Sequence, residues 1–211
     1  MKSIINKKNV DTTKQPLFFG EGLNLQRYDK YKYKKLFDLF LQQLSFFWRP
    51  EEVDLGGKEK SDFIVLTDHE KFIFTKNLSY QTLLDSVQGR GISHLLTDCS
   101  NPEFEAFAKA WEFSETIHSY SYTYIVKNVY PNPSEIFDDI LTDKEVLKRT
   151  TSVTKHYDDL INSIGSKDIN DRKRKLYLTF VSINILEGIR FYVSFACNYA
   201  LAQNKKMEGS A

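Results

Sequence analysis

The stretch "FSETIHSYSY" (residues 113–122) places a carboxylate and an imidazole inside an otherwise apolar helical pattern. The surrounding residues 102–130 are predicted to form one long helix. On an ideal helix, Glu115 and His118 lie on the same face as the large apolar side chains, about 60° apart around the axis and about 4.5 Å apart along it. Both side chains could therefore reach one ion, and Tyr122 follows one turn later on the same face.

The Glu-x-x-His spacing has a known use in helical bundles. Ferritin-like di-metal proteins take such a pair from each of two helices and a lone carboxylate from each of two others. A single pair also arises by chance, and taken alone it favours a buried ion pair or a histidine satisfied by its neighbour. Such a site would need further carboxylates from other helices.

Two other helical segments offer a lone carboxylate among apolar residues. Asp85 lies in "YQTLLDSVQGR" and Glu187 lies in "NILEGIRF". Each has a simpler explanation, since Asp85 could lie near solvent at a helix end and Glu187 could pair with Arg190. Together with Glu115 and His118, however, they supply the ligand types of a di-metal site from three helices.

The sequence predicts an all-α protein with five or six helices, because apolar and polar residues almost nowhere alternate as they do in strands. Capping patterns and prolines place the helices at about 31–48, 67–89, 102–130, from 133, from 142 and at 171–204. We expect an irregular arm over 1–27 and a partial ferritin-like domain over 28–211. The last helix is apolar enough to test for a membrane span, but Glu187 and Arg190 interrupt it, which favours a helix buried in a soluble bundle.

Composition excludes several classes of protein. The 29 basic and 28 acidic residues give a net charge of +1, so no global field attracts nucleic acid or an anionic membrane. Two cysteines, Cys99 and Cys197, form no disulfide framework, and the N-terminus lacks an apolar signal core. A cytoplasmic protein is the expectation.

Four segments together resemble the small, radical-generating subunit of class I ribonucleotide reductase. They are "SFFWRPEEVDL", "YQTLLDSVQGR", "FSETIHSYSYTYI" and "LEGIRFYVSFAC", in the order that the family has them. The resemblance runs from about residue 16 to residue 211 and implies a ferritin-like helical bundle. It also implies two iron ions, with mixed manganese–iron or manganese as alternatives, which reduce dioxygen and generate a tyrosyl radical. The radical serves a large subunit that converts ribonucleotides to deoxyribonucleotides, and the small subunit is expected to form a homodimer.

The resemblance also implies roles for particular residues. Tyr122 matches the radical tyrosine, and Trp48 matches the electron-transfer tryptophan. Without the resemblance, Trp48 would be interpreted as an aromatic anchor at a helix end. Phe191 and Phe195 match the apolar pocket around the radical, and they would also pack as ordinary core residues. The residues that match iron ligands are Asp85, Glu115, His118 and Glu187.

The chain departs from the family pattern in two places. Tyr120 and Tyr124 stand where many relatives have basic residues. The second Glu-x-x-His of the family follows a stretch like "MEGSA" (207–211), and among the four histidines of this chain only His118 has an acid three residues before it. We therefore expect the bundle to be incomplete at its C-terminus, the chain alone to be inactive, and a complementing C-terminal polypeptide to supply the remaining ligands.

Two other functions stay open at this point. One is a non-catalytic remnant that dimerises with or modulates an intact reductase. The other is a different di-metal oxidase on the same fold, which would keep the ligands but would not require Trp48 and Tyr122.

Overall fold

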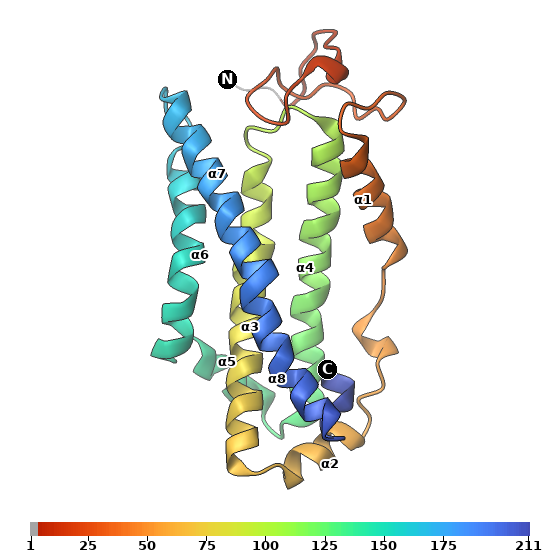
Figure 1. The fold of residues 1–211 in the computed structure, drawn as a ribbon, viewed down its shortest axis with the longest axis vertical. Coiled ribbons are helices and arrows are strands. Elements are labelled where there is room, and N and C mark those ends of the chain that lie inside the picture. The colour runs from red at the N-terminus through yellow and green to blue at the C-terminus, as the bar shows by residue number, and fades with distance from the viewer. Residues whose placement is uncertain (1–3) are drawn as a thin grey trace. The chain divides into compact units, whose positions relative to one another are not determined.

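The computed structural model describes residues 4–211, and its regular secondary structure is helical, preceded by an irregular N-terminal segment (Figure 1). Within these residues there is no strand, and the only β-type pairing is an isolated bridge between Phe18 and Cys99. The α-helices are α1 (Lys34–Ser45), α2 (Lys58–Val65), α3 (Asp68–Leu95), α4 (Pro102–Val129), α5 (Pro133–Ile140), α6 (Lys144–Asn162), α7 (Ile169–Ile185) and α8 (Phe191–Gln203). A π-helical turn, η3 (Leu186–Arg190), joins α7 to α8, and short 3-10 turns lie at η1 (Thr12–Lys14), η2 (Pro50–Glu52) and η4 (Glu208–Ser210).

Side-chain caps begin several helices. Thr67 and Glu70 form a capping box at the start of α3, in which the Thr67 backbone N–H donates to the Glu70 carboxylate and the Glu70 N–H donates to the Thr67 hydroxyl. The Asn101 side chain accepts from the Phe104 N–H at 3.0 Å at the start of α4. The helix expected from residue 142 is α6, and its cap is Asp143, whose carboxylate accepts from two N–H groups of the first turn.

The prediction of five or six helices is wrong in two respects. α2 was not predicted, because it is short and only weakly amphipathic, so its apolar residues show no clear helical spacing. The predicted last helix, 171–204, is divided by η3, and its first part begins at Ile169 with Asp168 as its cap. α3 also continues past the predicted end near Gly89 to Leu95.

The chain divides into two compact units, and α3 and α4 contribute residues to both. The first unit comprises residues 1–47 and 89–114. Its irregular N-terminal segment is held by buried polar groups: the Ser100 hydroxyl donates to the Pro16 carbonyl, and the Glu103 carboxylate accepts from the backbone N–H groups of Lys32 and Tyr33. The Ser100 bond fastens part of the predicted arm (1–27) to this unit, whereas the Glu103 bonds fix the chain just after it.

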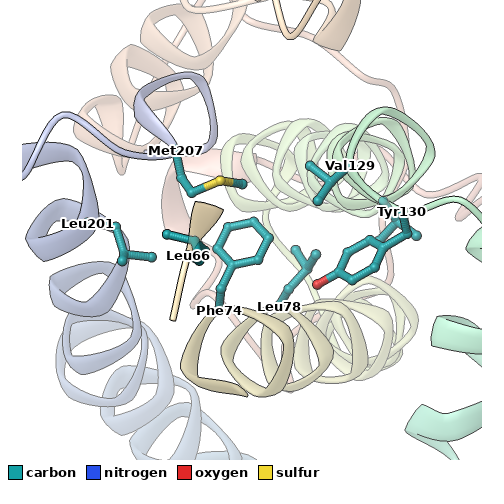
Figure 2. Close-up of a cluster of buried hydrophobic side chains, with 8 residues drawn as sticks. Leu66, Phe74, Leu78, Val129, Tyr130, Leu201 and Met207 are labelled. Atoms are coloured by element: carbon teal, nitrogen blue, oxygen red, sulfur yellow. The ribbon is translucent and has the colours of Figure 1, made fainter. Parts of the chain in front are cut away.

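The second unit, residues 48–88 and 115–211, contains every predicted site residue. One of its hydrophobic clusters joins α3, α4, α8 and the turn after α8 (Figure 2). The buried members of this cluster are Leu66, Phe74, Leu78, Val126, Val129, Tyr130, Leu201 and Met207. The Tyr130 and Thr75 hydroxyls form a hydrogen bond of 2.7 Å. This bond gives the buried Tyr130 hydroxyl the partner it requires, so its burial is explained by packing alone.

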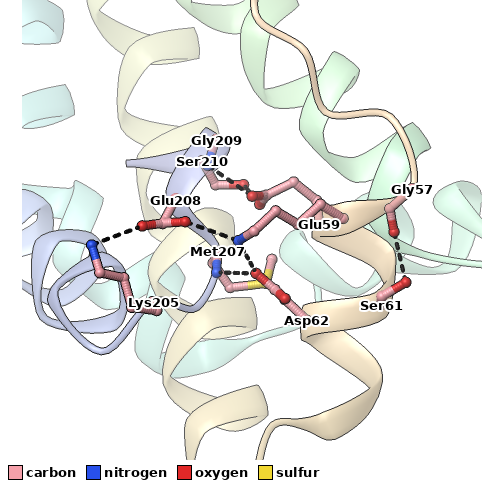
Figure 3. Close-up of polar contacts among 10 residues, drawn as sticks. Gly57, Glu59, Ser61, Asp62, Lys205, Met207, Glu208, Gly209 and Ser210 are labelled. Atoms are coloured by element: carbon pink, nitrogen blue, oxygen red, sulfur yellow. Dashed lines mark hydrogen bonds and ion pairs between the residues drawn. The ribbon is translucent and has the colours of Figure 1, made fainter.

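The turn after α8 is fastened to α2 by buried and partly buried acids (Figure 3). Glu59, which is 1% exposed, accepts from the Gly209 N–H at 2.7 Å and from the Ser210 hydroxyl at 2.5 Å. Asp62 accepts from the Met207 N–H at 3.0 Å, and Met207 itself has the left-handed backbone conformation (φ 52°). These bonds hold in place a backbone conformation that non-glycine residues adopt at a cost of about 1 kcal/mol or more.

The α7–η3–α8 segment has an exposed apolar face. The span Ile169–Gln203 is long and apolar enough to cross a membrane by length and composition, although the core helix of a soluble protein passes the same test. Only 22% of its most apolar window is buried, so the predicted burial of this helix is not met within this chain. The exposed face carries Tyr177, Ile185, Ile189, Tyr192, Val193 and Tyr199.

Candidate metal centre

Three of the predicted ligands converge in the second unit. Asp85 comes from α3, and Glu115 and His118 come from α4. One ligand atom from each residue lies within 4.8 Å of the other two. Asp85 and Glu115 are 2% and 3% exposed, so the simpler explanation of Asp85 as a residue near solvent is wrong.

Hydrogen bonds join these side chains to each other. His118 Nδ1 lies 3.1 Å from Glu115 Oε2 and 3.8 Å from Asp85 Oδ2. The Tyr122 hydroxyl donates to Asp85 Oδ2 at 2.6 Å. The helical spacing therefore placed Glu115, His118 and Tyr122 correctly, because α4 is unbroken from Pro102 to Val129.

Glu187 approaches the same group from the π-turn η3. Its Oε1 atom is buried and has no hydrogen-bond partner. The alternative pairing with Arg190 is wrong, because the Arg190 guanidinium donates instead to the Arg149 carbonyl at 3.1 Å and the Ser152 hydroxyl at 2.8 Å on α6. π-Turns of this kind occur frequently at functional sites, and a buried carboxylate oxygen without a partner is expected where a cation binds.

We call Asp85, Glu115, His118 and Glu187 the carboxylate–histidine cluster. Burial, followed by the charge of Glu115, raises the pKa of Asp85 to about 7 and the pKa of Glu187 to about 8. Burial alone would lower the pKa of His118. The net effect is a raised pKa, because the hydrogen bond and charge of Glu115, together with the charges of Asp85 and Glu187, outweigh the effect of burial. Acids that repel each other in this way are stabilised by a cation.

A cavity of about 290 Å³ lies beside the carboxylate–histidine cluster. Trp48, Tyr122, Phe191 and Phe195 all line it, so the structure brings together every residue predicted to carry or surround the radical. The rings of Phe191 and Phe195 stack at 5.9 Å between centroids. Burial, and then the charge of Asp85, raise the pKa of Tyr122 well above its ordinary value, so its phenol stays protonated at neutral pH.

One residue near the cluster was not singled out from the sequence. Tyr157 of α6 is 3% exposed, and its hydroxyl donates to the Gln88 side chain at 3.0 Å. Burial, and then the charges of Glu115 and Glu187, raise the pKa of Tyr157, which places this phenol within electrostatic reach of the cluster. Tyr157 could have been identified from its position on the apolar, buried face of α6, because a buried tyrosine hydroxyl requires a hydrogen-bond partner.

The residues present fit a metal ion. Carboxylate and imidazole groups are the donors of di-metal sites in helical bundles, and here three carboxylates and one imidazole meet around one cavity. The His118 side chain remains 45% exposed, so this ligand is only partly buried among the described residues. The helical fold and this set of carboxylate and imidazole donors are typical of the di-metal carboxylate class of proteins.

The chain belongs to the family "Ribonucleotide reductase, small chain", whose sequence profile matches residues 26–211. Small chains of this family hold a pair of metal ions. The subunit beta of ribonucleoside-diphosphate reductase from Buchnera aphidicola subsp. Baizongia pistaciae is 49% identical over 93% of this chain and 57% of its own length. The corresponding subunit beta of reductase 1 from Escherichia coli O157:H7 is 47% identical over 95% of this chain and 58% of its own length.

Solved structures agree with the family. The R2 subunit of ribonucleotide reductase from Clostridium botulinum superposes with a TM-score of 0.87 at 28% identity, over 99% of this chain and 64% of that one. The dimanganese(II)-NrdF of Streptococcus sanguinis shares the fold, with a TM-score of 0.69 at 21% identity over 90% of this chain and 62% of that one. The predicted ferritin-like fold is confirmed, and the chain spans 57% to 64% of the length of these relatives.

Proposed function

We propose that this chain is a working part of a ribonucleoside-diphosphate reductase small subunit, in which Tyr122 carries a stable radical beside a pair of metal ions. The observation that carries the proposal is the hydrogen bond from the Tyr122 hydroxyl to Asp85, at 2.6 Å, inside the carboxylate–histidine cluster. When bound, the metal pair supplies electrons to dioxygen and the oxidising power that removes one electron from a tyrosine. Asp85, Glu115, His118 and Glu187 would hold it, as two iron ions or as a manganese-containing pair.

The chain's own residues would prepare Tyr122 for this role. Asp85 gives the phenol proton an acceptor at a fixed atom, and Phe191 and Phe195 line the cavity with apolar rings that exclude water. Trp48, which lines the same cavity, would pass the electron between Tyr122 and a large catalytic subunit. That subunit would use the radical to reduce ribonucleotides to deoxyribonucleotides.

We also propose that residues beyond this chain complete the site. His118 is 45% exposed, Glu187 has a buried oxygen without a partner, and α7–η3–α8 presents an apolar face. A helix bearing the second Glu-x-x-His would supply the missing ligands and cover that face. This helix could be continuous with this chain or belong to a separate complementing polypeptide. In both cases it would provide the same ligands and cover the same apolar face.

Three further expectations follow the family. The working protein would be a homodimer, it would act with the large reductase subunit, and it would be cytoplasmic. The near-neutral charge and the absence of a disulfide framework in the sequence support the last of these.

The test is reconstitution with ferrous iron and dioxygen. The chain is mixed with a polypeptide that supplies the second Glu-x-x-His helix, and the tyrosyl signal is followed by electron paramagnetic resonance. We expect a signal in the mixture and no signal from the chain alone. In Tyr122→Phe the signal should disappear while the bound iron, measured by metal analysis, stays within about 20% of the unmodified complex.

Two outcomes would count against the proposal. A complex that binds iron but gives no tyrosyl signal would favour a different di-metal oxidase. A complex that binds no iron, with Tyr122→Phe indistinguishable from the unmodified chain, would favour a non-catalytic remnant.

A further inference from the structure

The segment that carries Trp48 is fastened to α4 by tyrosines. Residues 48–57, here called the tryptophan segment, connect the first unit of the chain to α2 and contain the turn η2. The Tyr120 hydroxyl donates a hydrogen bond to the Glu51 carboxylate. The Tyr124 hydroxyl donates to the Val53 carbonyl at 3.4 Å.

These two tyrosines and Tyr122 share one rigid element but face different ways. Tyr120 and Tyr124 are four residues apart on α4 and therefore lie on one side of it. Tyr122 is two residues from each of them and points about 160° away on an ideal helix. α4 thus presents Tyr122 to the cavity on one side and holds the tryptophan segment on another.

The far end of the tryptophan segment is also fixed. Leu55 is 1% exposed, and a Cβ added at Gly209 would lie only 2.8 Å from the Leu55 side chain. The Glu59 carboxylate, just beyond the segment, binds the same turn through Gly209 and Ser210 (Figure 3). A short segment fixed at its far end and bonded near its start has little freedom to move Trp48, which lies three residues before Glu51.

We propose that Tyr120, and to a smaller extent Tyr124, are positioning residues that hold Trp48 at a fixed place relative to Tyr122. The Tyr120 bond is the stronger of the two because its acceptor is a carboxylate, whereas 3.4 Å is long for a hydroxyl–carbonyl bond. The functional meaning of this placement rests on the proposed role of Trp48 in electron transfer. The placement itself can be measured on the metal-free chain, so it can fail or succeed independently of that role.

The experiment uses the whole chain labelled with 5-fluorotryptophan. The chain has two tryptophans, Trp48 and Trp111, so ¹⁹F nuclear magnetic resonance gives two signals, which Trp111→Phe assigns. The variants are Tyr120→Phe and Glu51→Ala, singly and together, with Tyr177→Phe as a matched control on an exposed tyrosine.

We expect the Trp48 signal to shift and broaden in both single variants, while the Trp111 signal stays in place. The double variant should resemble either single one, because each removes the same bond. In a Trp111→Phe background, the acrylamide quenching constant of Trp48 should rise about twofold in these variants and stay unchanged in Tyr177→Phe. Tyr124→Phe should give a smaller change of the same kind.

An unchanged Trp48 signal in Tyr120→Phe and Glu51→Ala would overturn the proposal. An equal change in Tyr177→Phe would also overturn it, because the effect would then be general loosening. If Tyr120→Phe does not fold, Glu51→Ala decides alone, since it removes only exposed atoms. Loss of the tyrosyl radical in the reconstitution experiment would not affect this measurement, which needs no metal.

Discussion

Raising the pH should destabilise the metal-free chain, because the carboxylate–histidine cluster holds protons that the unfolded chain releases. The pKa of Asp85 is about 7 and that of Glu187 about 8, against ordinary values of 3.8 and 4.5. Between about pH 5 and pH 7 the folded chain therefore keeps protons that the unfolded chain has lost. The free energy of unfolding falls as the pH rises through this interval, by at most about 1.4 kcal/mol per pH unit for each group.

Other titrating groups do not hide this slope. The raised pKa of His118 acts in the same direction, since its stabilising contribution is lost as the pH rises through the folded-state value. The strongly paired acids Asp29 and Glu70 have pKa values of about 2, so their contributions vanish only below about pH 4. Because neighbouring acids couple and the structure relaxes around them, we expect a net loss of about 2–4 kcal/mol from pH 5 to pH 7.5.

Urea unfolding followed by circular dichroism measures this slope directly. Asp85→Asn is the matched variant, because it keeps the size of the side chain and an oxygen for Tyr122 but removes one titrating group. It should reduce the slope by about half and be more stable than the unmodified chain at pH 8. Manganese(II) should stabilise the unmodified chain more at pH 8 than at pH 6, since binding displaces protons, and should have little effect on Asp85→Asn. A free energy of unfolding independent of pH, or an equal slope in Asp85→Asn, would refute the reasoning.

Two further predictions concern the turn after α8 and the π-turn η3. Gly209→Ala should lower the free energy of unfolding in urea by about 1–3 kcal/mol, because the added Cβ would lie 2.8 Å from the Leu55 side chain. Gly188→Ala is the control: its added Cβ meets no atom within 4 Å, so the same urea assay should show a neutral or slightly stabilising effect. Similar losses in both variants would contradict this account of Gly209. Arg190→Met should weaken manganese(II) binding about tenfold with little change in helix content, because the bonds that tie the π-turn of Glu187 to α6 are lost. Isothermal titration calorimetry tests this, and unchanged affinity would show that η3 holds Glu187 without Arg190.

The sequence predicted the α4 part of the site because that part depends on one uninterrupted helix. Glu115, His118 and Tyr122 keep the 3.6-residue phase, so their shared face followed from spacing alone. Asp85 required knowledge of which face of α3 is buried, and the resemblance to the family supplied it. The Tyr157–Gln88 bond joins residues far apart in sequence on separate helices, and no local pattern predicts such a contact.

Glu187 shows why helical phase alone could not place every ligand. Residues five apart on an α-helix point about 140° away from each other, so Leu186 and Phe191 would not both face the core of one continuous helix. In η3 the Phe191 N–H donates to the Leu186 carbonyl, which closes a five-residue turn and brings both side chains to the buried side, at 0% and 4% exposure. Glu187 follows Leu186 inside this turn, so its direction depends on the extra residue that the turn accommodates. The turn has no clear sequence signature: Gly188 could occur within an ordinary helix, and Arg190 contacts α6 only once the chain has folded. The sequence can therefore show that Glu187 is a candidate ligand, but the direction of its side chain depends on tertiary packing. Substitutions of Ser152 on α6 should change the direction of Glu187 without contacting the carboxylate–histidine cluster, because they remove a bond to Arg190.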